Sequence, residues 1–123
     1  MPVLATLARV YVDDLDTALP TFTALTGQEP SLRFPYRGLE LASVGGYLLV
    51  AGTEADLAPF RNVQATTIVS SVEEVLELTG KLGGEVLSGP NEVPTGRNLT
   101  VRHPGGAVIE YVQFADTAPT ARG

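Results

Sequence analysis

Residues 37–46 read RGLELASVGG, and residues 97–106 read RNLTVRHPGG. The two segments align without a gap, and each ends in a glycine pair that an apolar run follows, at 47–51 and at 107–111. An internal repeat of this kind indicates two copies of one supersecondary unit, neither of which can bury its apolar face alone. The repeat therefore predicts a β-hairpin in each half of the chain, with the glycine pair at its turn.

The elements around the first hairpin are predicted from β-rich runs and helix signals. We expect a strand over 6–12, a helix over 15–25 closed by Gly27, and strands over 31–36, 38–44 and 46–51. Pro20 lies inside the predicted helix. It is tolerated only if the helix begins near Asp16, because the N–H groups of a first turn have no partners.

The second half repeats this order. We expect a strand over 64–69, a helix from the capping box Ser71–Glu74 to about Leu82, and a short strand over 85–87. A Gly/Pro-rich loop, a strand over 98–102, the turn 104–106 and a strand over 107–113 follow. The sequence thus predicts an α+β fold of two tandem βαβββ modules. We expect one domain over 1–114, with module one at about 4–52, a connector at 53–62, module two at about 63–113, and a frayed tail over 115–123.

Composition narrows the classes of function. The chain of 123 residues has no cysteine, so it can form neither disulfides nor thiolate metal sites. Its formal net charge of −6 repels phosphate backbones, so we expect no nucleic-acid partner. No signal-peptide pattern and no apolar run of membrane-spanning length is present, so we expect a cytoplasmic protein with no membrane partner.

Four segments carry a resemblance to a known family. They are VDDL at 12–15, FTALTG at 22–27, LGGEVL at 82–87 and RHPGGAVIE at 102–110. In this order the chain resembles the vicinal oxygen chelate superfamily, which includes glyoxalase I, extradiol dioxygenases and bleomycin-resistance proteins. The resemblance covers about Leu4 to Gln113, although Asp is more common where His103 stands. It implies curved mixed or antiparallel sheets around a cavity, and a homodimer.

The resemblance also implies four metal ligands, one on the first and one on the last strand of each module. The matching positions are Leu7, Val50, Gln64 and Glu110. Two of these side chains are aliphatic and cannot coordinate an ion. The only histidine, His103, falls in a predicted turn, where we expect it to be solvated. We therefore expect no metal and no cofactor, and neither glyoxalase nor dioxygenase chemistry.

Strand alternation predicts which side chains line the cavity. Aligning the hairpins places Leu39, Leu41, Leu99 and Val101 on the helix side. It places Glu40, Thr100 and Arg102 toward the cavity, where Arg9 or Arg102 could simply pair with a glutamate. The aromatic side chains near the second strand are either packing residues or a stacking wall for a flat ligand. The predicted ligand-binding set is Leu7, Arg9, Tyr11, Phe34, Tyr36, Glu40, Val50, Phe60, Gln64, Thr66, Thr100, Arg102 and Glu110.

Three functions compete at this point. The first is a metal-free protein that sequesters a drug or another small natural product, as the resemblance to bleomycin-resistance proteins suggests. The second is a metal-independent isomerase, epimerase, cyclase or lyase that uses Glu110 or Glu40 as general base and Arg9 to stabilise an oxyanion. The third is a subunit or regulatory module without a ligand. In the first two the expected partners are a small organic molecule and a second copy of the chain.

Overall fold

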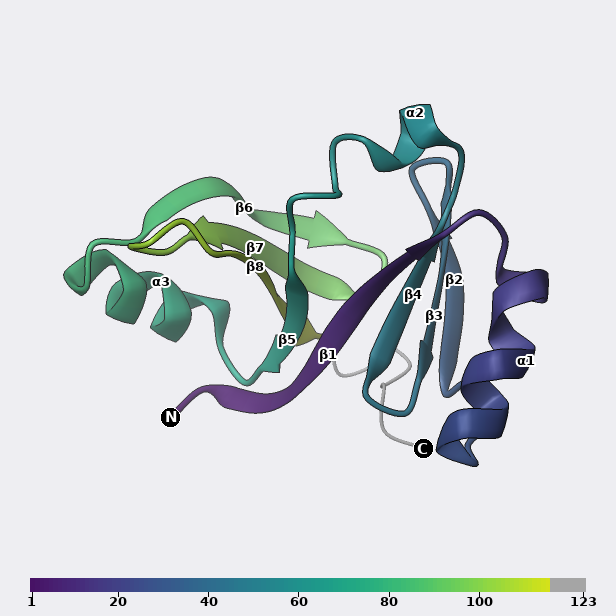
Figure 1. The fold of residues 1–123 in the computed structure, drawn as a ribbon. Coiled ribbons are helices and arrows are strands. Elements are labelled where there is room, and N and C mark those ends of the chain that lie inside the picture. Colours follow the sequence, from purple (N-terminus) through teal and green to yellow (C-terminus); the bar gives the residue numbers. More distant parts are fainter. Residues whose placement is uncertain (116–123) are drawn as a thin grey trace. The chain divides into compact units, whose positions relative to one another are not determined.

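The computed structural model describes residues 1–115, which form eight strands and three helices (Figure 1). The chain divides into two compact units, one of residues 8–62 and one of residues 1–7 together with 63–115. We call them the first and the second unit. Each unit packs helix against strands, so the predicted α+β class is confirmed. No helix among the described residues combines the length and the apolar character needed to cross a membrane. Except for Ala115, the predicted tail lies outside the described residues.

The first unit is a four-stranded sheet with one helix packed on it. Its elements are the C-terminal part of β1 (Val3–Val12), α1 (Leu15–Thr26), β2 (Leu32–Tyr36), β3 (Leu39–Val44), β4 (Tyr47–Ala51) and α2 (Glu54–Leu57). The strand order is β2-β3-β4-β1; only the β4–β1 pair is parallel. The helix α1 lies along one face of this sheet (Figure 1). The short helix α2 lies in the predicted connector, where Thr53 caps it by accepting from the Asp56 N–H at 3.1 Å.

Capping residues define both ends of α1, and the sequence predicted the one at its C-terminal end, Gly27. The Asp14 carboxylate accepts from the Thr17 N–H at 2.9 Å, and Gly27 ends the helix at φ +68°. The helix begins at Leu15, as predicted, one residue before Asp16. Pro20 is therefore the sixth helical residue and lies beyond the first turn. Its missing N–H leaves the Asp16 carbonyl without that intrahelical donor, a local cost that the packed apolar face of the helix offsets.

The second unit repeats this plan. Its elements are the N-terminal part of β1, β5 (Ala65–Val69), α3 (Val72–Lys81), β6 (Glu85–Val93), β7 (Gly96–Arg102) and β8 (Val108–Phe114). The strand order is β5-β8-β7-β6, and only the β5–β8 pair is parallel. The predicted cap of α3 is confirmed, since Ser71 Oγ accepts from the Glu74 N–H at 3.1 Å. The start of β1 joins this unit where the Ser70 N–H donates to the Pro2 carbonyl at 2.8 Å.

Strand β6 is much longer than predicted. We expected a strand over 85–87 followed by a loop, but β6 continues to Val93. The segment contains Gly89 and Pro90, which normally interrupt a strand. Two register shifts against β7, one between Val86 and Ser88 and one between Ser88 and Asn91, absorb this interruption. Because β6 is an edge strand, the lack of a backbone N–H group at Pro90 is tolerated there.

The two hairpins of the repeat differ in register by one residue. In the first, Val44 pairs with Tyr47 across a two-residue turn, whereas in the second Arg102 pairs with Val108 across a five-residue turn. Aligning the glycine pairs therefore displaces β3 by one residue relative to β7. A displacement of one residue moves every side chain of a strand to its opposite face.

The register difference corrects the predicted faces of β3. Ala42 and Val44, not Leu39 and Leu41, pack in the core with Leu15 of α1. On β7 the prediction is confirmed, because Leu99 and Val101 form the core beneath α3 together with Val69, Val72 and Val75.

Glu40 consequently lies on the α1 side of its sheet, where the sequence placed it wrongly toward the cavity. Arg33 bridges it at 3.5 Å and also contacts Asp16 of α1 at 3.2 Å. The hydrogen bond to Asp16 raises the pKa of the Arg33 guanidinium above its ordinary value. Glu40 is thus part of an exposed ion-pair group that links the helix to the sheet.

Candidate functional site

Glu110 is the carboxylate around which the candidate site is built. It lies on β8, directly opposite Thr66 of β5 and Thr100 of β7, on the sheet face that points away from α3. Its Oε1 accepts from Thr66 Oγ1 at 2.9 Å, and its Oε2 accepts from Asn98 Nδ2 at 3.1 Å. Both donors are buried, at 3% and 8% exposure, whereas Glu110 itself is half-buried. Two neutral donors thus orient a carboxylate that remains partly open.

Asn98 is the functional residue that the sequence analysis missed. The same alternation that placed Thr100 and Arg102 on this face of β7 places Asn98 there as well. The signal was therefore present, but the predicted strand began only at residue 98. A terminal strand position carries little weight in a prediction from pattern.

The other predicted residues of the second unit take on varied roles. Thr100 is half-buried beside Glu110. Gln64 is exposed, and its side-chain carbonyl accepts from the Val108 N–H at 3.3 Å. Arg102 is exposed and pairs with Glu85 of the adjacent strand at 3.0 Å. That surface pair answers the question of which glutamate holds Arg102.

In the first unit the predicted residues Arg9 and Tyr11 form a connected group. Arg9 Nη1 donates to the Tyr11 hydroxyl at 3.2 Å, and that hydroxyl donates to the Phe60 carbonyl at 2.5 Å. The Arg61 guanidinium lies 5.7 Å from the centre of the Tyr11 ring and also pairs with Glu54 at 2.7 Å. Arg9 therefore contacts the hydroxyl of Tyr11 and Arg61 the face of its ring, and a guanidinium is suited to recognising an anionic or carbonyl oxygen.

The predicted aromatic residues of β2 lie on the same face of their sheet. Phe34 pairs with Leu41 and Tyr36 with Leu39, so both side chains point away from α1, and both are half-buried. The adjacent Val50 is buried on this face, opposite Leu41. Contact of these residues with a ligand stays a prediction.

His103 differs from the solvated turn residue that we expected. It is half-buried, and its Nε2 lies 2.6 Å from the Tyr111 hydroxyl, with the two rings edge to face. Tyr111 packs against the core beneath α3, and this burial raises the pKa of its hydroxyl above the ordinary value. The pair therefore belongs to the helix side of the sheet, away from Glu110.

The metal site that the superfamily resemblance implies does not fit this chain. Leu7 and Val50 occupy two of its positions, are 6% and 1% exposed, and have no donor atom. At the other two, Gln64 uses its carbonyl on a backbone N–H and Glu110 accepts from Thr66 and Asn98. Within residues 1–115, no three His, Cys, Asp or Glu side chains gather in a group that could hold an ion.

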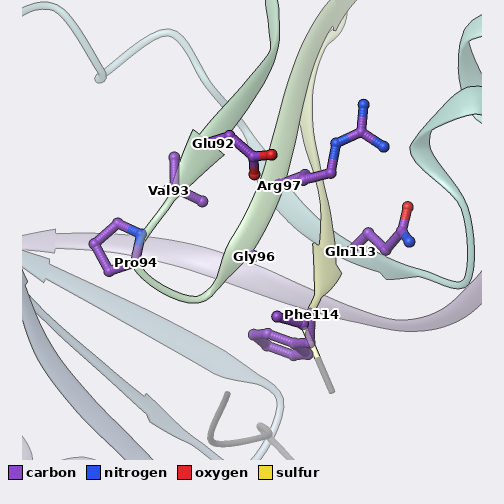
Figure 2. Close-up of a pocket in the computed structure, with 8 residues that line it drawn as sticks. Glu92, Val93, Pro94, Gly96, Arg97, Gln113 and Phe114 are labelled. Carbon is purple, nitrogen blue, oxygen red and sulfur yellow. The ribbon is translucent and has the colours of Figure 1, made fainter. Parts of the chain in front are cut away.

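A shallow pocket of about 270 Å³ lies at the end of the β6–β7 hairpin (Figure 2). Arg97 and Gln113, which are paired across β7 and β8, project from the same side of these strands in Figure 2. Arg97 bonds to Glu73, which lowers the pKa of that carboxyl, and Gln113 Oε1 accepts from the Val72 N–H at 2.9 Å. Both polar side chains therefore hold the start of α3, so this pocket is a consequence of packing.

Comparison with known proteins finds a relative that is similar in sequence, and more distant proteins that share the fold. No protein-family model matches the chain, and no curated protein matches it by sequence. An uncharacterized protein from Methanosarcina mazei is 43% identical, with coverage of 94% of this chain and 95% of that one and a TM-score of 0.85.

Methylmalonyl-CoA epimerases are among the more distant solved structures. The enzyme from Mycobacterium tuberculosis is 18% identical over 92% of this chain and 89% of that one, with a TM-score of 0.72. A Streptomyces coelicolor variant bound to 2-nitronate-propionyl-CoA is 19% identical over 94% and 99%, also with a TM-score of 0.72. Similarity at this level of identity shows a shared fold, and the chemistry has to be argued from the site.

Proposed function

We propose that this chain, which shares its fold with methylmalonyl-CoA epimerases, is a member of the vicinal oxygen chelate superfamily and an enzyme that transfers a proton within a small organic carbonyl compound, with Glu110 as general base. The observation that carries the proposal is the half-buried Glu110 carboxylate, oriented by two buried neutral donors on the sheet face opposite α3. Among the competing functions, this one corresponds to the isomerase or epimerase class. The structural similarity to methylmalonyl-CoA epimerases supports it over sequestration.

The proposed reaction needs only a base and a place for negative charge. The Glu110 carboxylate accepts the proton from the carbon next to a carbonyl group. The electron pair of that C–H bond passes into the carbonyl group, which becomes an enolate with its charge on oxygen. Glu110 releases its proton to solvent, and transfer of a solvent proton to the opposite face of the same carbon gives an epimer, whereas return of the proton from Glu110 to a different atom gives an isomer. A base of this kind contributes roughly 10²- to 10⁴-fold to a rate.

In the first unit, Arg9 is the residue that we propose for contact with an anionic or carbonyl oxygen of a ligand. Its guanidinium is oriented by the Tyr11 hydroxyl, which is itself fixed by the Phe60 carbonyl. A guanidinium that is already oriented needs little reorganisation when it binds such an oxygen. The aromatic residues Phe34 and Tyr36 remain in the proposed ligand-binding set as apolar contacts.

Sequestration of a drug or natural product is the second candidate. The half-buried aromatic rings of Phe34 and Tyr36, which share the face of β2 opposite α1, favour it. A protein of this kind binds its ligand and leaves it unchanged. The two candidates therefore differ in one measurable property, the exchange of a ligand proton with solvent.

Proton exchange in deuterated water tests the proposal. Methylmalonyl-CoA, the compound that the neighbouring structures suggest, is incubated with the protein in D₂O, and loss of its α-proton signal is followed by NMR. Other acyl thioesters and small keto acids follow as further probes. We expect at least one probe to exchange, and Glu110→Gln to slow the exchange by roughly 10²- to 10⁴-fold.

The matched control is Glu77→Gln, because Glu77 is an exposed carboxylate of α3 that pairs with Lys81. It should exchange the probe at the rate of the unaltered protein. A probe that binds in calorimetry without any exchange would instead support sequestration. Equal exchange rates for the unaltered protein and for Glu110→Gln would refute the role of Glu110 as the general base.

The proposed active form is a homodimer. Strands β2 and β6 are sheet edges, and β1 carries the exposed apolar side chains of Val3 and Leu4, at 56% and 65% exposure. Unpaired edges and apolar side chains favour association with a second copy. Light scattering at micromolar concentrations tests this, and a monomer at every concentration would contradict it.

A further inference from the structure

We infer that Asn98 is a positioning residue for Glu110 and that Asn91, placed by the bulges of strand β6, fixes the orientation of the Asn98 amide. The inference rests on the proposed role of Glu110 as a base and assigns the groups that prepare it. Neither asparagine touches a substrate in this scheme. Both act through the Glu110 carboxylate.

A chain of hydrogen bonds joins these residues. Asn91 Nδ2 donates to Ser88 Oγ at 2.9 Å and to Asn98 Oδ1 at 3.2 Å. Asn98 Nδ2 in turn donates to Glu110 Oε2 at 3.1 Å. Because the Asn98 oxygen is occupied by a donor, only its NH₂ group can face the carboxylate. Rotating this amide by half a turn would place NH₂ against NH₂ and oxygen against carboxylate.

The bulges of β6 make this contact possible. Residues three apart on a regular strand point to opposite faces, so Ser88 and Asn91 should diverge. The register shift between them places Ser88 opposite Thr100 and Asn91 opposite Asn98, so both share the face of Glu110. A bulge commonly redirects a side chain in this way.

Gly89 makes the bulge compact. It has φ +96°, and a Cβ added there would lie 2.5 Å from the Asn98 carbonyl oxygen. Any other residue would therefore push β6 away from β7 at the point where Asn91 reaches Asn98.

The arrangement distinguishes Asn98 from the second donor. The Thr66 hydroxyl can rotate and can either donate or accept, so it suits a carboxylate and a carboxylic acid equally. The fixed NH₂ group of Asn98 can only donate and therefore favours the ionised carboxylate. Asn98 is 8% exposed, so water does not replace this bond easily. Asn98 thereby orients one oxygen of the Glu110 carboxylate.

NMR titration of the labelled protein tests this inference without any substrate. The carboxyl ¹³C signal of Glu110, assigned by its loss in Glu110→Gln, and the side-chain ¹⁵N–¹H₂ signal of Asn98 are followed with pH. We expect both signals to move with one common midpoint. An Asn98 signal that is indifferent to the ionisation of Glu110 would overturn the contact.

Two variants test the role of Asn91. Asn91→Ala removes the donor that fixes Asn98, so the Asn98 side-chain signal should follow the Glu110 carboxyl signal less closely. Asn98→Ala removes the donor itself and should move the Glu110 carboxyl ¹³C signal across the titration. Asn91 is only half-buried, so its variant keeps the test available if the buried Asn98 variant folds poorly. Asn62→Ala, at an exposed position of the first unit, is the control and should leave both signals unchanged.

Proton exchange with a probe adds a kinetic measurement. Asn91→Ala should lower kcat several-fold and leave KM unchanged, because residue 91 orients the base without binding substrate. An unchanged Glu110 carboxyl signal in Asn98→Ala, together with an unchanged Asn98 signal in Asn91→Ala, would refute the positioning role. Absence of exchange in the unaltered protein would refute the proposed function instead, and the titration would still decide the role of Asn98.

Discussion

The cost of removing the Glu110 charge separates a functional carboxylate from a structural one. In Glu110→Gln the new amide can present its oxygen to Asn98 Nδ2 and its NH₂ group to the Thr66 hydroxyl, which can turn to accept. Both hydrogen bonds persist, but neither is charge-assisted any longer. Each therefore contributes about 1 kcal/mol less to the free energy of unfolding. A neutral amide is also cheaper to hold half-buried than a carboxylate, which offsets part of this loss. We expect Glu110→Gln to lower the free energy of unfolding by about 1 kcal/mol or less.

Glu110→Ala supplies the contrast. It removes both bonds and leaves the buried Nδ2 of Asn98 without its carboxylate acceptor, which costs about 2–4 kcal/mol. Urea unfolding followed by circular dichroism measures both values, and coincident transitions at different wavelengths check that the chain unfolds as one unit. Should the glutamine variant lose as much stability as the alanine variant, the charge itself is needed for folding. The assignment of Glu110 as a base prepared for chemistry would then be refuted.

Three further predictions follow from the same geometry. Elemental analysis should find no stoichiometric divalent ion, and chelation should leave proton exchange unchanged; one tightly held metal per chain, lost in Gln64→Ala, would contradict this. Arg9→Met should weaken the binding of an anionic or carbonyl ligand by roughly 10-fold or more in calorimetry, whereas Arg33→Met, which breaks an exposed pair on the α1 side, should not. The raised pKa of Tyr111 means that the unfolded chain loses this proton first as pH rises. Stability should therefore fall above about pH 10, less so in Tyr111→Phe, as thermal melts across alkaline pH would show.

Alternation along strands predicted a large part of the candidate site. Thr66 and Glu110 were assigned to one face from two separate strands, and they are cross-strand neighbours joined by a hydrogen bond. Arg9 and Tyr11 were likewise assigned to one face and contact each other. These assignments succeeded because side-chain direction on a regular strand depends only on the parity of the residue number.

Assigning side-chain faces from the parity of the residue number fails wherever one strand gains or loses a residue relative to the strand it pairs with. Glu40 was misplaced because a two-residue turn and a five-residue turn both contain a glycine pair, and the pair was taken as the point of alignment. Turn length is set by backbone dihedral angles and packing around the turn. A glycine pair is compatible with several turn lengths and therefore does not determine which one forms.

The stretch 88–91, SGPN, is where local sequence and observed structure disagree most. Gly89 and Pro90 are poor strand residues, and a strand of equal length with β-branched residues would pair more regularly with β7. A regular strand, however, would turn Asn91 to the face opposite Ser88 and Asn98. The departure from strand-like sequence thus provides the hydrogen bond that orients Asn98 toward Glu110. Departures from local preference are expected at functional positions, because the fold alone gives no reason to retain them. The irregular stretch of β6 is therefore an independent reason to place the functional residues of this protein on the Glu110 face of its second unit.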